Sequence, residues 1–91
     1  MSAFDVIVKA TNTIRSRGQD YDSPEGERSG GKAAAAFSAI TGKQISASEV
    51  YLLLQIVKDV RQWTSPQYHE DSAIDCIAYA GLKAESLERG E

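Results

Sequence analysis

The stretch SASEVYLLLQIVKDVRQW, residues 46–63, is the most apolar part of this 91-residue chain. It opens with Ser46 and Glu49 in the spacing of a capping box, in which two side chains accept hydrogen bonds from backbone N–H groups at a helix start. Its apolar residues then recur every three to four positions, as on one side of a helix. They are Val50, Leu52, Leu53, Leu54, Ile56, Val57, Val60 and Trp63. The stretch therefore predicts the core helix of the fold.

Apolar residues cover more of this predicted helix than burial in a small domain requires. One face runs through residues 50, 53, 57 and 60, and an adjoining face runs through residues 52, 56 and 63. A surface helix of a four-helix domain needs only one such stripe. We therefore expect a homo-oligomer, a homodimer or larger, formed through residues 46–63 or through the turn that follows them.

Two aromatic residues, Trp63 and Tyr68, flank the turn after this helix. Aromatic side chains at such a place usually cap a core, but tryptophan and tyrosine are also frequent anchors of protein interfaces. Both interpretations stay open at this point. Trp63 and Tyr68 are therefore the candidate interface residues.

The beginning of the chain predicts a first helix and then a long polar loop. Ser2 and Asp5 have the spacing of a capping-box variant and start a helix over residues 3–16. Gly18 is expected to end it, because glycine readily adopts the left-handed conformation found at helix ends. The loop spans about residues 18–31 and is rich in turn dipeptides.

Two more helices complete the prediction. An alanine-rich helix covers about residues 31–41, with Ser29 as its candidate cap, and a last helix covers about residues 71–88, capped by Asp71 or Ser72. No segment shows the sustained alternation of a strand. The predicted fold is all-α: one compact four-helix domain over the whole chain, in which the last two helices form an antiparallel hairpin and the first packs across it.

Composition limits the partners that this chain is expected to have. Ten Lys and Arg against thirteen Asp and Glu give a net charge of −3, which argues against nucleic acid and anionic membranes as partners. No apolar run reaches the roughly 18 residues of a membrane span, and the first residues do not resemble a signal peptide. We therefore expect a cytoplasmic protein.

Charged residues on the predicted hairpin are spaced to meet across it. Lys58 and Arg61 lie on one helix and Asp71 and Asp75 on the other, at distances from the turn that place Arg61 level with Asp71 and Lys58 level with Asp75. The simplest interpretation is a salt-bridge network. The alternative is a polar pocket, extended by Tyr79, that binds a phosphorylated ligand through the cations and a divalent metal through Asp71 and Asp75.

A glycine-rich segment, GERSGGKA at residues 26–33, matches part of a phosphate-binding P-loop. Ala33 stands where that motif needs a hydroxyl for Mg²⁺, and no strand precedes the loop, so a true P-loop is not expected. Simple anion binding by Arg28, Ser29 and Lys32 at a helix start is one interpretation. A glycine turn with no ligand is the other.

The chain holds one histidine and one cysteine, His69 and Cys76. We expect an exposed or locally hydrogen-bonded imidazole in the turn before the last helix, and a buried, inert thiol within that helix. A single cysteine forms no internal disulfide. Neither residue predicts catalysis, and no cofactor is expected.

Three separate patterns carry a resemblance to a known family. They are the RG…YDxPxGERS pattern within residues 17–29, KDxR at residues 58–61 and HxDSxxDxxxY at residues 69–79. Over about residues 15–85 the chain resembles a family of small phage and prophage proteins of unknown function. The resemblance implies origin and shape. Together with the acidic charge and the lack of a catalytic set, it leads us to expect a noncatalytic accessory protein that binds a host or phage protein in the bacterial cytoplasm.

The last helix is also similar to the final core helix of MazG-like all-α nucleotide pyrophosphohydrolases, which hold Mg²⁺ there with an E-x-x-D pair and on another helix with E-E-x-x-E. Asp75 matches this pattern, whereas Ser72 replaces its glutamate. The resemblance implies the alternative function, a Mg²⁺-dependent nucleotide-binding protein or pyrophosphohydrolase. The residues that would take part are Asp71 and Asp75 at the metal, Lys58, Arg61 and Arg28 at the triphosphate, and Glu25 or Glu27 of a second subunit.

Overall fold

The computed structural model consists of four helices, and it describes residues 1–20 and 29–91. The helices are α1 (Ala3–Asp20), α2 (Ser29–Thr41), α3 (Ala47–Trp63) and α4 (Glu70–Glu88). No strand occurs in the described residues. The prediction of an all-α domain is therefore confirmed.

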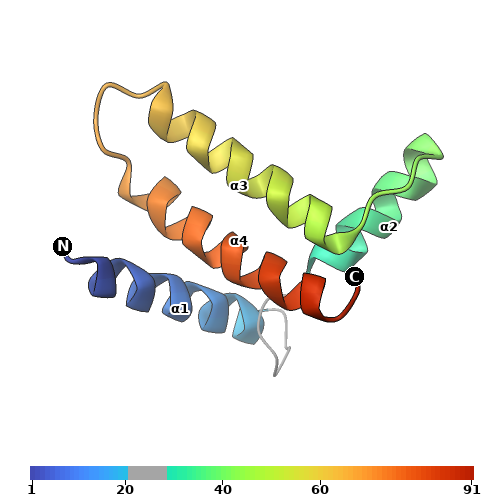
Figure 1. The fold of residues 1–91 in the computed structure, drawn as a ribbon, viewed down its shortest axis with the longest axis horizontal. Coiled ribbons are helices and arrows are strands. Elements are labelled where there is room, and N and C mark those ends of the chain that lie inside the picture. Colours follow the sequence, from blue (N-terminus) through green and yellow to red (C-terminus); the bar gives the residue numbers. More distant parts are fainter. Residues whose placement is uncertain (21–28) are drawn as a thin grey trace.

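Helix α4 lies between α3 on one side and α1 on the other, and α2 extends from the beginning of α3 (Figure 1). Helices α3 and α4 are antiparallel, as predicted. Of the helices that the structure describes, only α4 packs against α1, so the expectation that α1 lies across the hairpin is wrong. The reason lies in its contact face: Ala10 is 2% exposed and Ile14 half-buried, whereas Ile7 is 52% exposed. This narrow face covers one neighbouring helix and not two.

Both predicted capping boxes are present. At the start of α1, the Ser2 N–H donates to Asp5 Oδ2 over 3.0 Å and the Asp5 N–H donates to Ser2 Oγ over 3.2 Å. At the start of α3, the Ser46 N–H donates to Glu49 Oε1 over 2.9 Å and the Glu49 N–H donates to Ser46 Oγ over 3.1 Å. The backbone hydrogen bonds from Ser2 and Ser46 lower the pKa of Asp5 and of Glu49 respectively. These contacts satisfy N–H groups that have no partner within the helix.

The first helix is longer than predicted, because α1 continues through Gly18 to Asp20. Gly18 is buried in the last full turn of the helix. Packing of the helix outweighs the cost of about 1 kcal/mol that a glycine brings to a helix interior. The predicted loop over residues 18–31 is accordingly shorter at both ends, and residues 21–28 of it lie outside the described residues.

The predicted caps of the other two helices are also corrected. Ser29 is the first residue of α2 and not its cap. Helix α4 begins at Glu70 with His69 as its N-cap, and the His69 side chain makes no capping hydrogen bond. Ser72 Oγ instead lies 2.6 Å from Nδ1 of His69, in hydrogen-bond contact. Ser72 is therefore engaged with the imidazole, and Asp71 lies within the first turn.

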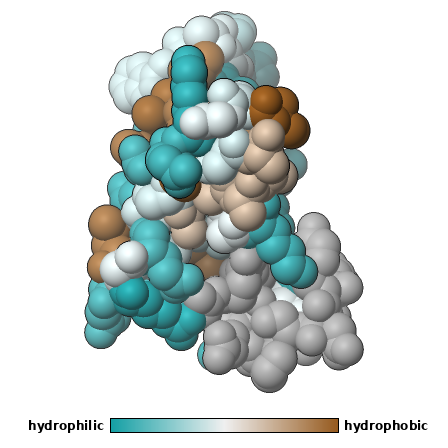
Figure 2. Space-filling model, turned by 90° about the vertical axis from the view of Figure 1, so that its right-hand side faces the viewer, coloured by the Kyte–Doolittle hydropathy of each residue, from teal (hydrophilic) through white to brown (hydrophobic). Residues whose placement is uncertain are grey.

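The buried core is small and consists mainly of small side chains. Its apolar members are Ala10, Ala34, Ala47, Tyr51, Ala78 and Leu82. Alanine lets helices approach closely but buries little apolar area. Many larger apolar side chains are exposed, and some appear as brown atoms among polar ones on the end of the molecule where α2 lies (Figure 2). None of the described helices combines the length and the hydropathy needed to cross a membrane.

Candidate functional site

The carboxylate of Asp75 on α4 lies between two cationic side chains from two other helices. Its Oδ1 is 3.4 Å from Nη2 of Arg17 on α1, and its Oδ2 is 2.9 Å from Nζ of Lys58 on α3. The side chains of Lys58 and Asp75 are only 15% and 17% exposed, so salt in the solvent screens this pair weakly. The predicted contact between Lys58 and Asp75 is confirmed, and Arg17 extends it to a third helix.

Two tyrosines continue this group of residues towards α2. The Tyr79 hydroxyl accepts a hydrogen bond of 3.4 Å from Nη1 of Arg17, and the guanidinium carbon lies 5.5 Å from the ring centroid, within cation–π range. The Tyr79 ring stacks on Tyr51 of α3, with centroids 6.3 Å apart. The Tyr51 hydroxyl accepts a hydrogen bond of 3.0 Å from the backbone N–H of Gly30 on α2. All four helices thus contribute to one polar cluster, which consists of Arg17, Gly30, Tyr51, Lys58, Asp75 and Tyr79.

The charges of the polar cluster decide what it can hold. Among the described residues of the cluster, Arg17 and Lys58 outnumber Asp75, which leaves an excess of one formal positive charge there. Each oxygen of Asp75 faces one of the two cations, and a metal ion at this carboxylate would have to displace them. Within residues 1–20 and 29–91, no three Asp, Glu, His or Cys side chains gather in a way that suits a metal ion. A metal at Asp71 and Asp75 stays a prediction.

The second predicted ion pair does not form. Arg61 and Asp71 are both exposed, and no ion pair joins them in the described part of the chain. The three-residue step from Lys58 to Arg61 turns a side chain by about 60° around the helix axis, because successive residues are about 100° apart. Lys58 contacts α4 through Asp75, whereas the Arg61 side chain is exposed. Arg61 lines a shallow hollow of about 400 Å³ with Thr64, Ser65 and His69.

Neutral groups hold the turn where Arg61 and Asp71 were expected to meet. The Gln62 side-chain amide donates a hydrogen bond of 3.0 Å to the carbonyl oxygen of Gln67. Its Oε1 accepts a hydrogen bond of 2.7 Å from the His69 N–H. His69 is exposed and hydrogen-bonded to Ser72, as expected of an imidazole with a local structural role. The turn is therefore joined by amide and hydroxyl hydrogen bonds.

The candidate anion site at the start of α2 is described only in part. Ser29 and Lys32 lie in the first turn of α2, and both side chains are exposed. Arg28 lies outside the described residues, as do Glu25 and Glu27. Anion binding by these residues therefore stays a prediction.

Cys76 has the environment of an unreactive thiol. Its side chain is half-buried, with Sγ 3.6 Å from Oδ1 of Asp59 and 4.0 Å from the carbonyl oxygen of Gln55. Burial raises the pKa of the Cys76 thiol, and the nearby Asp59 carboxylate raises it further. Because the thiolate is the reactive form, this environment suits the predicted structural role.

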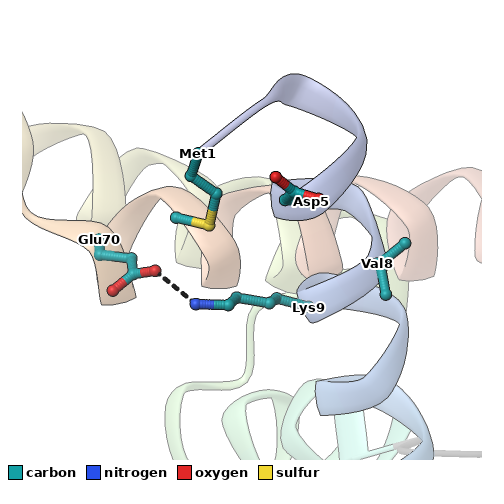
Figure 3. Close-up of a pocket in the computed structure, with 5 residues that line it drawn as sticks. All are labelled: Met1, Asp5, Val8, Lys9 and Glu70. Carbon is teal, nitrogen blue, oxygen red and sulfur yellow. Dashed lines mark hydrogen bonds and ion pairs between the residues drawn. The ribbon is translucent and has the colours of Figure 1, made fainter.

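A hollow of about 520 Å³ lies between the first turns of α1 and α4 (Figure 3). Met1 and Val8 supply apolar lining, and Lys9 Nζ contacts Glu70 Oε1 at 2.8 Å along its edge. The hydrogen bond from Lys9 to Glu70 raises the pKa of Lys9. An apolar hollow with charged groups at its edge suits an apolar side chain flanked by polar groups.

The chain was compared with families, curated proteins and solved structures. A family model described as a domain of unknown function, DUF6378, matches residues 5–87. The chain belongs to the DUF6378 family. No curated protein and no solved structure matches it. The matched range of this DUF6378 chain includes every side chain of the polar cluster.

Two side chains of the polar cluster in this DUF6378 protein, those of Arg17 and Tyr51, were not among the candidates predicted from the sequence. Arg17 lies three residues after Ile14 and seven after Ala10, the spacing of one helix face, so its position on the α4 side of α1 is visible in the pattern. Tyr51 carries a weaker signal, as a hydroxyl within the most apolar segment. A hydroxyl in such a place needs a hydrogen-bond partner, but the sequence does not indicate that the partner is the N–H of Gly30.

Proposed function

We propose that this protein is a noncatalytic accessory protein that acts by binding another protein, of the bacterial host or of a phage. One observation carries the proposal: large apolar side chains in the first half of α1 lie on the surface. Exposed apolar patches of this kind mark interaction sites on soluble proteins. Trp63 and Tyr68 are 84% and 63% exposed, which argues against core capping and favours the interface role.

The first half of α1 is the proposed docking surface for that protein. Phe4 is 80% exposed, Ile7 52% and Val8 56%, and Val8 also lines the hollow of Figure 3. The Lys9–Glu70 ion pair provides polar partners at the edge. The expected partner presents an apolar side chain to the hollow, surrounded by hydrogen-bonding groups.

The polar cluster supports the noncatalytic part of the proposal. Asp75 is the best-placed carboxylate, and Arg17 and Lys58 contact its two oxygens. A general base or metal ligand needs a lone pair directed at substrate or metal. An Asp75 held in this way serves to join helices.

Site-specific photo-crosslinking tests this proposal. We would introduce benzoylphenylalanine at Phe4 or Val8 in the bacterial cells that express the protein, with Glu88, an exposed polar position on α4, as the matched control. We expect both α1 positions to give an adduct with the same second protein, and Glu88 to give none. Adducts with other copies of this chain only, or no adduct, would contradict the proposal.

A second candidate function is binding of a nucleotide or another phosphorylated ligand, with Mg²⁺ as in the MazG-like alternative. The observation in its favour is the excess of one positive charge beside two stacked tyrosines. Arg17 and Lys58 are suited to phosphate oxygens, and an aromatic ring is suited to a base. Titration calorimetry with ATP and Mg²⁺ measures this binding directly.

A further inference from the structure

We infer that a second copy of this chain covers the exposed face of α3, in a dimer with twofold symmetry. This α3 face consists of Leu52, Leu53, Ile56, Val57, Val60 and Trp63, whose exposed fractions range from 44% for Val57 to 84% for Trp63. The inference goes beyond the proposed function, because it uses a different helix and a different partner. The crosslinking experiment on α1 and the experiment below can fail independently.

The α3 face is continuous and nearly free of charge. At about 100° per residue, its six side chains lie within a sector of roughly 140° of the helix circumference. Asp59 and Arg61 border the sector, and Glu49 enters it only at the first turn. Four members, Leu53, Ile56, Val60 and Trp63, follow the alternating three- and four-residue spacing of a helix that packs on another helix.

The opposite side of α3 already makes the contacts within the chain. Tyr51 is 2% exposed and Lys58 is in contact with Asp75. Helix α3 packs against α4 and α2, and neither covers the α3 face. The two sides of one helix thus have separate roles, one within the chain and one outward.

The surface area of the chain is larger than that of a compact monomer of the same mass. A monomeric globular protein of 9.9 kDa exposes about 5,200 Å². This chain exposes 6154 Å², an excess of roughly 950 Å². A standard interface buries about 800 Å² on each partner, so the excess is close to one half of a stable dimer interface.

The shape of the chain leads to the same conclusion. Its radius of gyration is 13.9 Å, against about 12 Å for a compact domain of this length. The chain measures 23 Å along its shortest principal axis. A second copy packed on the α3 face would give a thicker, more compact particle, with the apolar side chains of α3 buried at its centre. Because this face is apolar and nearly free of charge, it meets no like-charge repulsion when it packs on its own copy across a twofold axis.

Sedimentation equilibrium of the full chain tests the inference. At micromolar concentration we expect twice the chain mass of 9.9 kDa. Val60→Asp should weaken the dimer on the order of 100-fold or more, because each dimer would bury two unpaired carboxylates. Ile40→Asp is the matched control, since Ile40 is equally apolar, 84% exposed and on α2 outside the face. It should leave the mass unchanged, and circular dichroism should show helical signal in all three proteins.

A second measurement covers the case in which Val60→Asp does not fold. Nitroxide labels at Ile56→Cys or at Ile40→Cys, both with Cys76→Ser, report the distance between two copies by pulsed electron resonance. The label pair at position 56 should be closer than the pair at position 40. A monomeric wild-type mass at 100 µM, a folded Val60→Asp dimer of unchanged strength, or the absence of dipolar coupling at position 56 would overturn the inference.

Discussion

Two levels of the α3–α4 hairpin, about one helical turn apart, contain the same types of charged residue and arrange them differently. Lys58 and Asp75 are largely buried and form an ion pair of 2.9 Å, whereas Arg61 and Asp71, near the turn, are exposed and form none. The difference arises from the surroundings of each pair. Arg17 of α1 contacts both Asp75 and Tyr79, whereas Arg61 lines a shallow hollow at the turn. Spacing brings charged residues level, but neighbouring helices determine whether they pair.

The largest expected loss of stability is that of Asp75→Asn, which removes the charge of the largely buried carboxylate. The substitution keeps the shape of the side chain and leaves Lys58 largely buried without its counter-charge, so we expect the free energy of unfolding to fall by about 1–3 kcal/mol. In a domain of this size that corresponds to a melting temperature lower by about 4–8 °C per kcal/mol. Thermal unfolding followed by circular dichroism measures it.

Asp71→Asn is the matched control for that prediction. Asp71 is exposed and one turn away on the same helix, so its change should stay within about 0.5 kcal/mol. If both variants lowered the free energy of unfolding equally, the distinction between the largely buried and the exposed pair would be wrong. Calorimetry of the same Asp75→Asn protein separates the functions: loss of Mg²⁺-dependent ATP binding with an unchanged melting temperature would favour the nucleotide candidate over the structural role.

Gly30→Ala should destabilise the protein by disturbing the packing of α2 against Tyr51. A Cβ at residue 30 would lie 2.5 Å from Cζ of Tyr51, so the ring or α2 must move, at a cost of about 1–3 kcal/mol. Gly31→Ala is the neighbouring control, because nothing lies within 4 Å of its added Cβ. It should stabilise the protein by up to about 1 kcal/mol, since alanine favours a helix over glycine. Urea unfolding with the two variants moving in the same direction would contradict this account.

The smallest expected effect is the contribution of Cys76 to stability at high pH. Burial and the Asp59 carboxylate raise the pKa of the Cys76 thiol above its ordinary value of 9.0. The unfolded chain therefore loses its thiol proton first as the pH rises, and the free energy of unfolding should decrease from about pH 9 up to the higher pKa of the folded state. Cys76→Ser should remove this part of the decrease, as measured by urea unfolding between pH 8 and pH 11. An identical slope in both proteins would show that the thiol does not contribute.

Local features of the sequence were sufficient to predict much of the fold. The capping boxes at Ser2 and Ser46 formed as predicted, because a cap involves residues only three positions apart. The pair Lys58–Asp75 was also predictable, since a short antiparallel hairpin places its residues level. The end of α1 was predicted wrongly from Gly18, because this buried glycine lies within the helix and its local preference for a helix end did not decide where α1 stops.

The sequence by itself thus determined the all-α class, the starts of α1 and α3 and one ion pair, all of which depend on short-range spacing and hydrogen bonding. Only the tertiary structure decided that Arg17 joins Asp75, that Tyr51 contacts Gly30, and that α1 lies beside α4 and not α3. It also decided that the apolar residues of α3 face outward. Periodicity shows that a helix has an apolar face, but which neighbour covers that face depends on how all the helices share a limited core.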